Sequence, residues 1–159
     1  MGFRRKWTGQ SERGFSLIEI VITVSIMLAV SLIAIPIVRT VYSYYQIRSA
    51  TSYVAGAIQS TRYQAISNGY GYKIVLNKAA STLQVQSDPA RTSTFANVGN
   101  PIPLAGSSVP VVLGQDTALL LRPSGIVQAA AGSTTITLTL GARTETITVS
   151  SYGNIKVTP

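Results

Sequence analysis

Side chains that could carry out chemistry are scarce in this chain of 159 residues. It has 13 lysines and arginines, a formal net charge of +8, and neither histidine nor cysteine. Histidine is the commonest general base and metal ligand, and cysteine supplies thiolate nucleophiles, zinc ligands and disulfides. We therefore expect no catalytic residues, no metal site and no cofactor, and a protein that is not an enzyme. The carboxylates are few and widely spaced: Glu12, Glu19, Asp88, Asp116 and Glu145.

One carboxylate, Glu19, lies where a charge is costly. It is the only charged residue in the segment Phe15–Val38. As an α-helix this segment would extend about 36 Å, enough to cross a hydrocarbon core of about 30 Å. A carboxylate within a membrane span costs up to about 3 kcal/mol, so we expect Glu19 to have a function and a partner. Four basic residues before the segment favour a cytoplasmic N-terminus, with the rest of the chain across the membrane: Arg4, Arg5, Lys6 and Arg13.

Three ordinary explanations of the apolar segment are incomplete. The small residues Ala29-Val30-Ser31 resemble the cleavage site of a secretory signal, but apolar sequence continues from there to Val38. A lipoprotein signal requires a cysteine, which the chain lacks. A plain membrane anchor explains the length of the segment but not Glu19. A secreted protein and a membrane-anchored β-domain remain as alternatives at this point.

The sequence Gly14-Phe15-Ser16-Leu17-Ile18-Glu19, between a basic leader and the apolar segment, resembles the prepilin signal of type IV pilins and type II secretion pseudopilins. The resemblance implies that prepilin peptidase cleaves between Gly14 and Phe15, and that the new amine of Phe15 is methylated. It also implies that Glu19 pairs with the N-terminal amine of a neighbouring subunit and so fixes the register of assembly. Pro36 stands where pilins often carry a proline that kinks the helix.

On this resemblance the chain has three parts. Residues 1–14 are a cleaved leader, residues 15–38 are a transmembrane and filament-core helix, and residues 39–159 are a periplasmic head. The precursor is then a single-pass protein of the bacterial inner membrane that later enters a pilus or pseudopilus. The implied partners are prepilin peptidase, membrane lipid before assembly, other pilins or pseudopilins through the N-terminal helix, and the inner-membrane assembly platform.

We expect the helix to continue into the head as far as about residue 67. Apolar and small residues recur at intervals of three and four from Val41 to Ala65, and Asn68-Gly69 is a typical C-terminal stop. Four polar residues fall largely on the other side of this helix: Arg48, Gln59, Arg62 and Gln64. The tyrosines fit an interfacial aromatic belt for the first three and core packing for one of the last two: Tyr42, Tyr44, Tyr45, Tyr53 and Tyr63.

After the helix the pattern becomes that of β-strands, with threonine alternating with aliphatic residues as in a sheet with one wet face. Residues 88–117, rich in proline and glycine, predict a long loop around one short strand, Val109–Leu113. The fold class is therefore α+β: a long N-terminal helix, transmembrane in its first half, packed on an antiparallel β head. The pilin resemblance implies two small sheets in this head. Six further strands are predicted: Tyr72–Leu76, Thr82–Gln86, Leu119–Arg122, Thr135–Leu140, Glu145–Val149 and Asn154–Thr158.

The C-terminal half resembles the GspH/FimT family of minor pilins and pseudopilins. The resemblance rests on Leu121-Arg122-Pro123-Ser124-Gly125, on the hairpin after it, and on Gly153-Asn154-Ile155-Lys156. It implies a minor subunit that primes or caps either a type IV pilus or a type II secretion pseudopilus. Some FimT-like members bind DNA through a Gly-Arg-x-Arg motif, so DNA uptake is the alternative function, with Arg143 and Lys156 as candidate contacts. Here asparagine and lysine replace the two arginines of that motif, which weakens phosphate binding.

Overall fold

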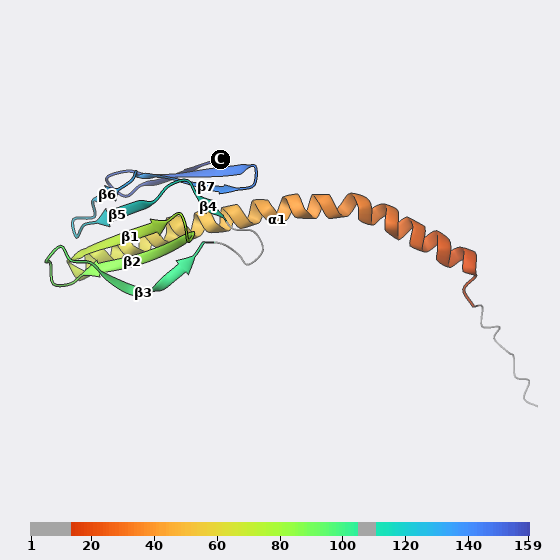
Figure 1. Ribbon diagram of the computed structural model, residues 1–159, viewed down its shortest axis with the longest axis horizontal. Coiled ribbons are helices and arrows are strands. Elements are labelled where there is room, and N and C mark those ends of the chain that lie inside the picture. The colour runs from red at the N-terminus through yellow and green to blue at the C-terminus, as the bar shows by residue number, and fades with distance from the viewer. Residues whose placement is uncertain (1–13, 105–110) are drawn as a thin grey trace, which may run out of the picture. The chain divides into compact units, whose positions relative to one another are not determined.

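The computed structural model describes residues 14–104 and 111–159, with Pro36 described by its backbone alone. The chain divides into two compact units, Met1–Thr40 and Val41–Pro159, and we call the second the head unit. One helix, α1 (Leu17–Asn68), takes part in both units. The nine strands of the described residues all follow it, in the head unit (Figure 1). This layout confirms the α+β class predicted from the sequence.

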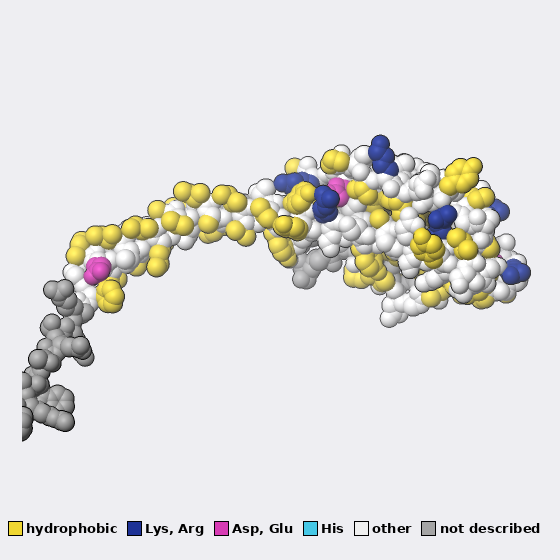
Figure 2. Space-filling view, turned by 180° about the vertical axis from the view of Figure 1, so that it is seen from behind, with side chains coloured by type: hydrophobic (Ala, Val, Ile, Leu, Met, Phe, Trp, Pro, Cys, Tyr) yellow, Lys and Arg dark blue, Asp and Glu magenta, His cyan; other side chains and the backbone are white. Residues whose placement is uncertain are grey.

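The first unit leaves its apolar side chains uncovered. From Leu17 to Val38 the large hydrophobic side chains are between 48% and 79% exposed, and Figure 2 shows them along this stretch of helix. The apolar window of the helix has a mean hydropathy of 2.7 and none of it is buried. By length and composition, α1 can therefore cross a membrane.

The strands of the head unit form two antiparallel sheets. One sheet contains β1 (Gly71–Asn77), β2 (Thr82–Asp88), β3 (Ala96–Pro103), β5 (Thr117–Leu121) and β6 (Val127–Ala131). The other contains β4 (Val112–Leu113), β7 (Thr135–Leu140), β8 (Arg143–Val149) and β9 (Ile155–Thr158). The strand orders are β3-β2-β1-β5-β6 and β4-β7-β8-β9, so the β1–β5 pair joins strands that are distant in sequence.

Two strands occur where the sequence predicts none. The first, β3, lies within residues 88–117, which were predicted to be mainly loop, and it contains Pro101 and Pro103. Proline is tolerated because β3 is an edge strand whose eight residues are all exposed. The second, β6, is the opposite edge and is largely alanine, which has a low strand propensity. The strand predicted at Val109–Leu113 is Val112–Leu113, and the rest of that prediction falls partly outside the described residues.

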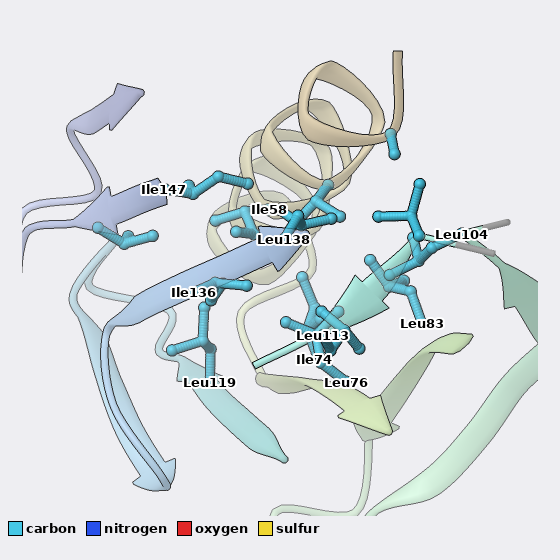
Figure 3. Packing of buried hydrophobic residues seen from close by; sticks show 14 of the residues in the cluster. Ile58, Ile74, Leu76, Leu83, Leu104, Leu113, Leu119, Ile136, Leu138 and Ile147 are labelled. Atoms are coloured by element: carbon cyan, nitrogen blue, oxygen red, sulfur yellow. The ribbon is translucent and has the colours of Figure 1, made fainter. Parts of the chain in front are cut away.

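The core of the head unit forms where one side of α1 meets the inner faces of both sheets. Figure 3 shows Ile58 of the helix beside Leu138 and Ile147, within a cluster that also includes residues of the first sheet. The helix ends at the predicted stop, where Gly69 has a φ of 71° and its N–H donates to a carbonyl one turn earlier. The predicted apolar stripe is confirmed at the buried positions Ile47, Ala50, Val54, Ile58, Thr61 and Ala65. Its first two residues, Val41 and Tyr44, are exposed, and Thr51, which the pattern did not include, is buried.

The other side of α1 differs from the prediction in two ways. Tyr53 and Tyr63 are 42% and 64% exposed, so the prediction that one of them packs in the core is wrong. Gln59 and Arg62, predicted to lie largely on the far side, instead hydrogen-bond to carbonyls in turns of the head unit. A helix flanked by two sheets has little surface that faces only water, and sequence periodicity does not show this.

Candidate functional site

The predicted cleavage site lies just before α1. Gly14, Phe15 and Ser16 precede the helix and are exposed, and the Phe15 side chain is 80% exposed. A Cβ added to Gly14 would meet nothing within 4 Å, and its φ does not lie in the left-handed region. Neither space nor backbone conformation within the described chain therefore requires glycine at position 14. A requirement for glycine there would come from something that binds this segment, such as a protease that needs an unhindered backbone.

Glu19 lies in the first turn of α1. The carbonyl of Ser16 accepts hydrogen bonds from the backbone N–H groups of Glu19 (3.0 Å) and Ile20 (3.2 Å), which makes Ser16 the N-cap residue. Ser16 and Glu19 have the spacing of a capping box. The partial positive charge of a helix N-terminus favours a carboxylate at this position. Local helix chemistry thus explains how Glu19 is tolerated, but not why it is unpaired.

The other polar side chains of the apolar segment are satisfied within the helix. The hydroxyls of Thr23, Ser25 and Ser31 donate to backbone carbonyls three or four residues earlier, at 2.9, 2.7 and 2.7 Å. Glu19 has no side-chain hydrogen bond or ion pair within the described part of the chain. It is therefore the one charged group of this segment that needs a partner from elsewhere when water is removed.

Pro36 lies within the bounds of α1. The kink expected there stays a prediction, because the side chain falls outside the described residues. Residues 1–13 of the predicted leader also fall outside them.

The candidate DNA contacts do not share a surface. Arg143 begins β8, with its guanidinium carbon 5.6 Å from the centre of the Tyr44 ring. Lys156 lies in β9 opposite Thr148. Alternate residues of a strand share a face, so Arg143 lies on the face of the buried Glu145, whereas Thr148 and Lys156 lie on the other face. The two cations therefore do not form one phosphate-binding patch.

Two of the three acids of the head unit stabilise turns, because their carboxylates accept hydrogen bonds from backbone N–H groups. Both oxygens of Asp88 accept backbone N–H groups, from Thr92 at 3.0 Å and Ser93 at 2.7 Å. Asp116 accepts the N–H of Lys78 at 2.6 Å. Within residues 14–104 and 111–159, no group of three or more acidic, histidine or cysteine side chains could hold a metal ion. These carboxylates have structural roles that their residue types alone did not reveal.

Sequence reasoning missed Arg62 as an organising residue. Its Nε donates to the carbonyl of Gly125 at 2.8 Å, and Gln59 donates to the carbonyl of Gly153 at 3.1 Å. A Cβ at Gly153, whose φ is 77°, would lie 2.5 Å from Nε of Arg62. The two glycine motifs used for the GspH/FimT resemblance thus meet at one arginine of α1. The glycines could be read in the sequence, but their contact with a residue on the predicted polar side of the helix could not.

Comparison with known proteins shows a similarity at the N-terminus. Residues 9–35 match the family model of the prokaryotic N-terminal methylation motif. Neither the curated proteins nor the solved structures gave a match. The matched residues include Gly14, Phe15 and Glu19, and the motif implies processing by prepilin peptidase and assembly with other pilins. The motif is that of type IV pilin-like proteins, a family of structural subunits, and the chain is similar to these proteins over this N-terminal segment.

Proposed function

We propose that the chain is a minor pilin or pseudopilin, which prepilin peptidase processes and which primes or caps a type IV pilus or a type II secretion pseudopilus. One observation carries the proposal. None of the apolar window of α1 is buried, and its one carboxylate, Glu19, has no partner within the described residues and lies four residues after Phe15, whose bond to Gly14 is exposed. A plain membrane anchor needs the apolar surface alone, whereas a filament subunit needs both the surface and the charge.

The path to the filament starts in the inner membrane. The basic leader keeps the N-terminus in the cytoplasm, and the head crosses to the periplasm. The peptidase cuts after Gly14 and methylates the amine of Phe15. The apolar helix then leaves the lipid and packs among similar helices, so that van der Waals contacts between helices replace contacts with lipid.

The new amine and the carboxylate complement each other between subunits. A positive charge at a helix N-terminus is disfavoured by the helix dipole of its own chain, whereas a carboxylate there is favoured. In a dry filament core each charge is costly unless it is paired. Glu19 of one subunit and the Phe15 amine of the next therefore neutralise each other, and only one axial register allows every pair to form.

The test is incorporation into filaments. Glu19→Gln keeps the shape of the side chain and removes its charge, and Ser25→Ala is the matched control because the Ser25 hydroxyl is already bonded within the helix. We expect both variants to be processed. We expect Glu19→Gln to fall at least about tenfold in purified filaments relative to membranes, since breaking a buried charge pair costs several kcal/mol. Incorporation of Glu19→Gln at the level of Ser25→Ala would contradict the proposal.

DNA uptake is not proposed. Arg143 and Lys156, its candidate contacts, lie on opposite faces of their sheet. A minor structural subunit of GspH/FimT type needs no such patch.

A further inference from the structure

A cavity of about 410 Å³ opens beside the helix at the start of the head unit. Its lining includes Tyr44 and Arg48 of α1, Glu145 of β8 and Val157 of β9. Neither the methylation motif nor the proposed assembly mechanism uses any of these residues. Figure 2 shows acidic and basic side chains close together on the head unit.

The acid in this cavity is buried and incompletely bonded. Glu145 is 8% exposed, and its Oε2 atom is buried without a hydrogen-bond partner. The nearby hydroxyl of Thr51 is already used, because it donates to the carbonyl of Ile47 at 2.9 Å. Within the described chain, no arginine or lysine forms an ion pair with Glu145. A buried carboxylate without donors is destabilising, so a cation that donates hydrogen bonds would complement Glu145.

Two arginines flank the ring of Tyr44: Arg48, which lines the cavity, and Arg143, which lies outside its lining. The guanidinium carbons of Arg48 and Arg143 lie 5.8 and 5.6 Å from the centre of the Tyr44 ring. Arg48 also donates to the Tyr44 hydroxyl at 2.7 Å. Both arginines are exposed, and neither forms an ion pair with an acid among the residues described. The forked donors of guanidinium suit phosphate oxygens, so the rim is built to take an anion.

We propose that this cavity binds a phosphoethanolamine group. Its primary ammonium would donate to Glu145, and its phosphate would accept hydrogen bonds from Arg48 and Arg143. A simple anion would leave the carboxylate unpaired, and a simple cation would be repelled by the arginines. A choline group would also fail, because its quaternary ammonium has no N–H to donate.

The source of this group is a membrane lipid, an inference that rests on the proposed function. Tyr44 follows Val38, the end of the apolar segment, by six residues of α1, which rise about 9 Å. The headgroup layer extends roughly 5–8 Å beyond the hydrocarbon on each side. Tyr42 and Tyr45 lie beside Tyr44 in sequence and are 58% and 65% exposed, as expected of aromatic residues at a membrane surface. The cavity would hold the head unit at the membrane until the helix leaves for the filament.

The test is lipid selection by the full-length protein. The chain is purified in detergent, incubated with equal amounts of phosphatidylethanolamine, phosphatidylcholine and phosphatidylglycerol, and analysed by native mass spectrometry. We expect phosphatidylethanolamine to be retained about tenfold over each of the others, since charge-assisted hydrogen bonds decide the difference. Glycerophosphoethanolamine, which has the headgroup without acyl chains, should compete only at much higher concentration. Competition at equal concentration would overturn the lipid source.

Variants locate the site. Glu145→Gln and Arg143→Gln should each abolish the preference, whereas Arg122→Gln removes an exposed charge elsewhere on the head unit and should keep it. Circular dichroism checks that each variant is folded, and Arg143 lies on the surface, so its replacement is readily tolerated.

Equal retention of the three lipids by the wild-type chain would overturn the proposal, as would a preference that survives both site variants. A cross-link from Glu145 to a basic residue of another subunit, without lipid selection, would assign the cavity to subunit contact instead. Each of these failures leaves the N-terminal processing intact, so it is distinct from failure of the proposed function.

Discussion

The two halves of α1 bury their apolar residues by different means. From Leu17 to Val38 every large hydrophobic side chain is exposed, whereas in the head unit the same helix buries a stripe at three- and four-residue spacing. The second half has its own sheets as a partner. The first half has none within the described residues, so lipid or other helices must supply it. A single helix thus has one surface that its own sheets bury and another that, in our account, serves assembly.

Two glycines make the same contrast. Gly153 has a positive φ and no room for a Cβ beside Arg62, so the fold requires it. Gly14 has open space around it and an ordinary φ, so the fold does not. Glycine serves the head unit as a packing residue and, in our account, serves the N-terminal segment as a substrate residue.

The largest expected effect comes from Gly14→Val. Because nothing lies within 4 Å of a Cβ at this position, we expect the head unit to unfold at the wild-type denaturant concentration. Processing should be lost, because a branched side chain blocks the approach of a protease to the backbone. Immunoblots of membranes would show precursor alone. Normal cleavage of this variant would contradict the assignment of Gly14 as the processing site.

A second prediction compares one deletion in the two halves of the helix. Ile58 is 0% exposed and Ile33 is 68% exposed. We expect Ile58→Ala to lower the free energy of unfolding of the head unit by about 2–5 kcal/mol, and Ile33→Ala to change it by less than about 0.5 kcal/mol. Urea unfolding of the full-length chain in mild detergent, followed by circular dichroism, measures both. Equal effects would remove the distinction between the two surfaces.

A third prediction concerns the contact between the glycine turns and the helix. Gly153→Ala should destabilise the head unit by roughly 1–3 kcal/mol, because alanine is strained at a φ of 77° and its Cβ collides with Arg62. In an Arg62→Ala background the same substitution should cost less, because the collision is gone. A double-mutant cycle measured by urea unfolding tests this coupling. Strict additivity would show that the two residues do not interact.

The smallest expected effect is on pH dependence in the head unit. The hydroxyls of Tyr70 and Tyr72 are hydrogen-bonded at 3.1 Å, and this bond raises the pKa of Tyr70 above its ordinary 10.0. A raised pKa in the folded state contributes stability that is fully present below pH 10 and is lost as the pH rises through the raised value. Titration of tyrosinate absorbance should show late ionisation of Tyr70, and Tyr72→Phe should return the pKa of Tyr70 toward 10.0. An unchanged titration curve in Tyr72→Phe would contradict this cause.

Periodicity and local signals predicted the long elements well. The helix expected at residues 15–67 is Leu17–Asn68, and the first hairpin, expected at Tyr72–Leu76 and Thr82–Gln86, is Gly71–Asn77 and Thr82–Asp88. These elements depend on interactions between near neighbours in sequence, which composition and spacing report directly. The edge strands β3 and β6 were missed because their residues gain strand structure only from the neighbouring strand.

Contacts between residues that are far apart in the sequence could not be predicted from it. The pairing of Ile74 with Leu119 makes β1 and β5 neighbours in the sheet. In the sequence, however, β2, β3 and β4 lie between these two strands. Helical periodicity places Arg62 on the polar side of α1, because it does not show that turns from the sheets reach that side. The unpaired Oε2 of Glu145 is likewise a product of tertiary packing. Gly14, Phe15 and Glu19, by contrast, were predicted as functional residues from the sequence because their signal is contiguous.

The most direct test of the account is the N-terminus of the protein in its native membranes, determined by intact mass and N-terminal peptide sequencing. We predict a chain that begins at Phe15 and carries one methyl group on its amine. A chain that begins at Met1 would be a plain membrane-anchored β-domain, and one that begins near Leu32 would be a secreted protein. Either result would contradict the assignment of the exposed half of α1 to a filament.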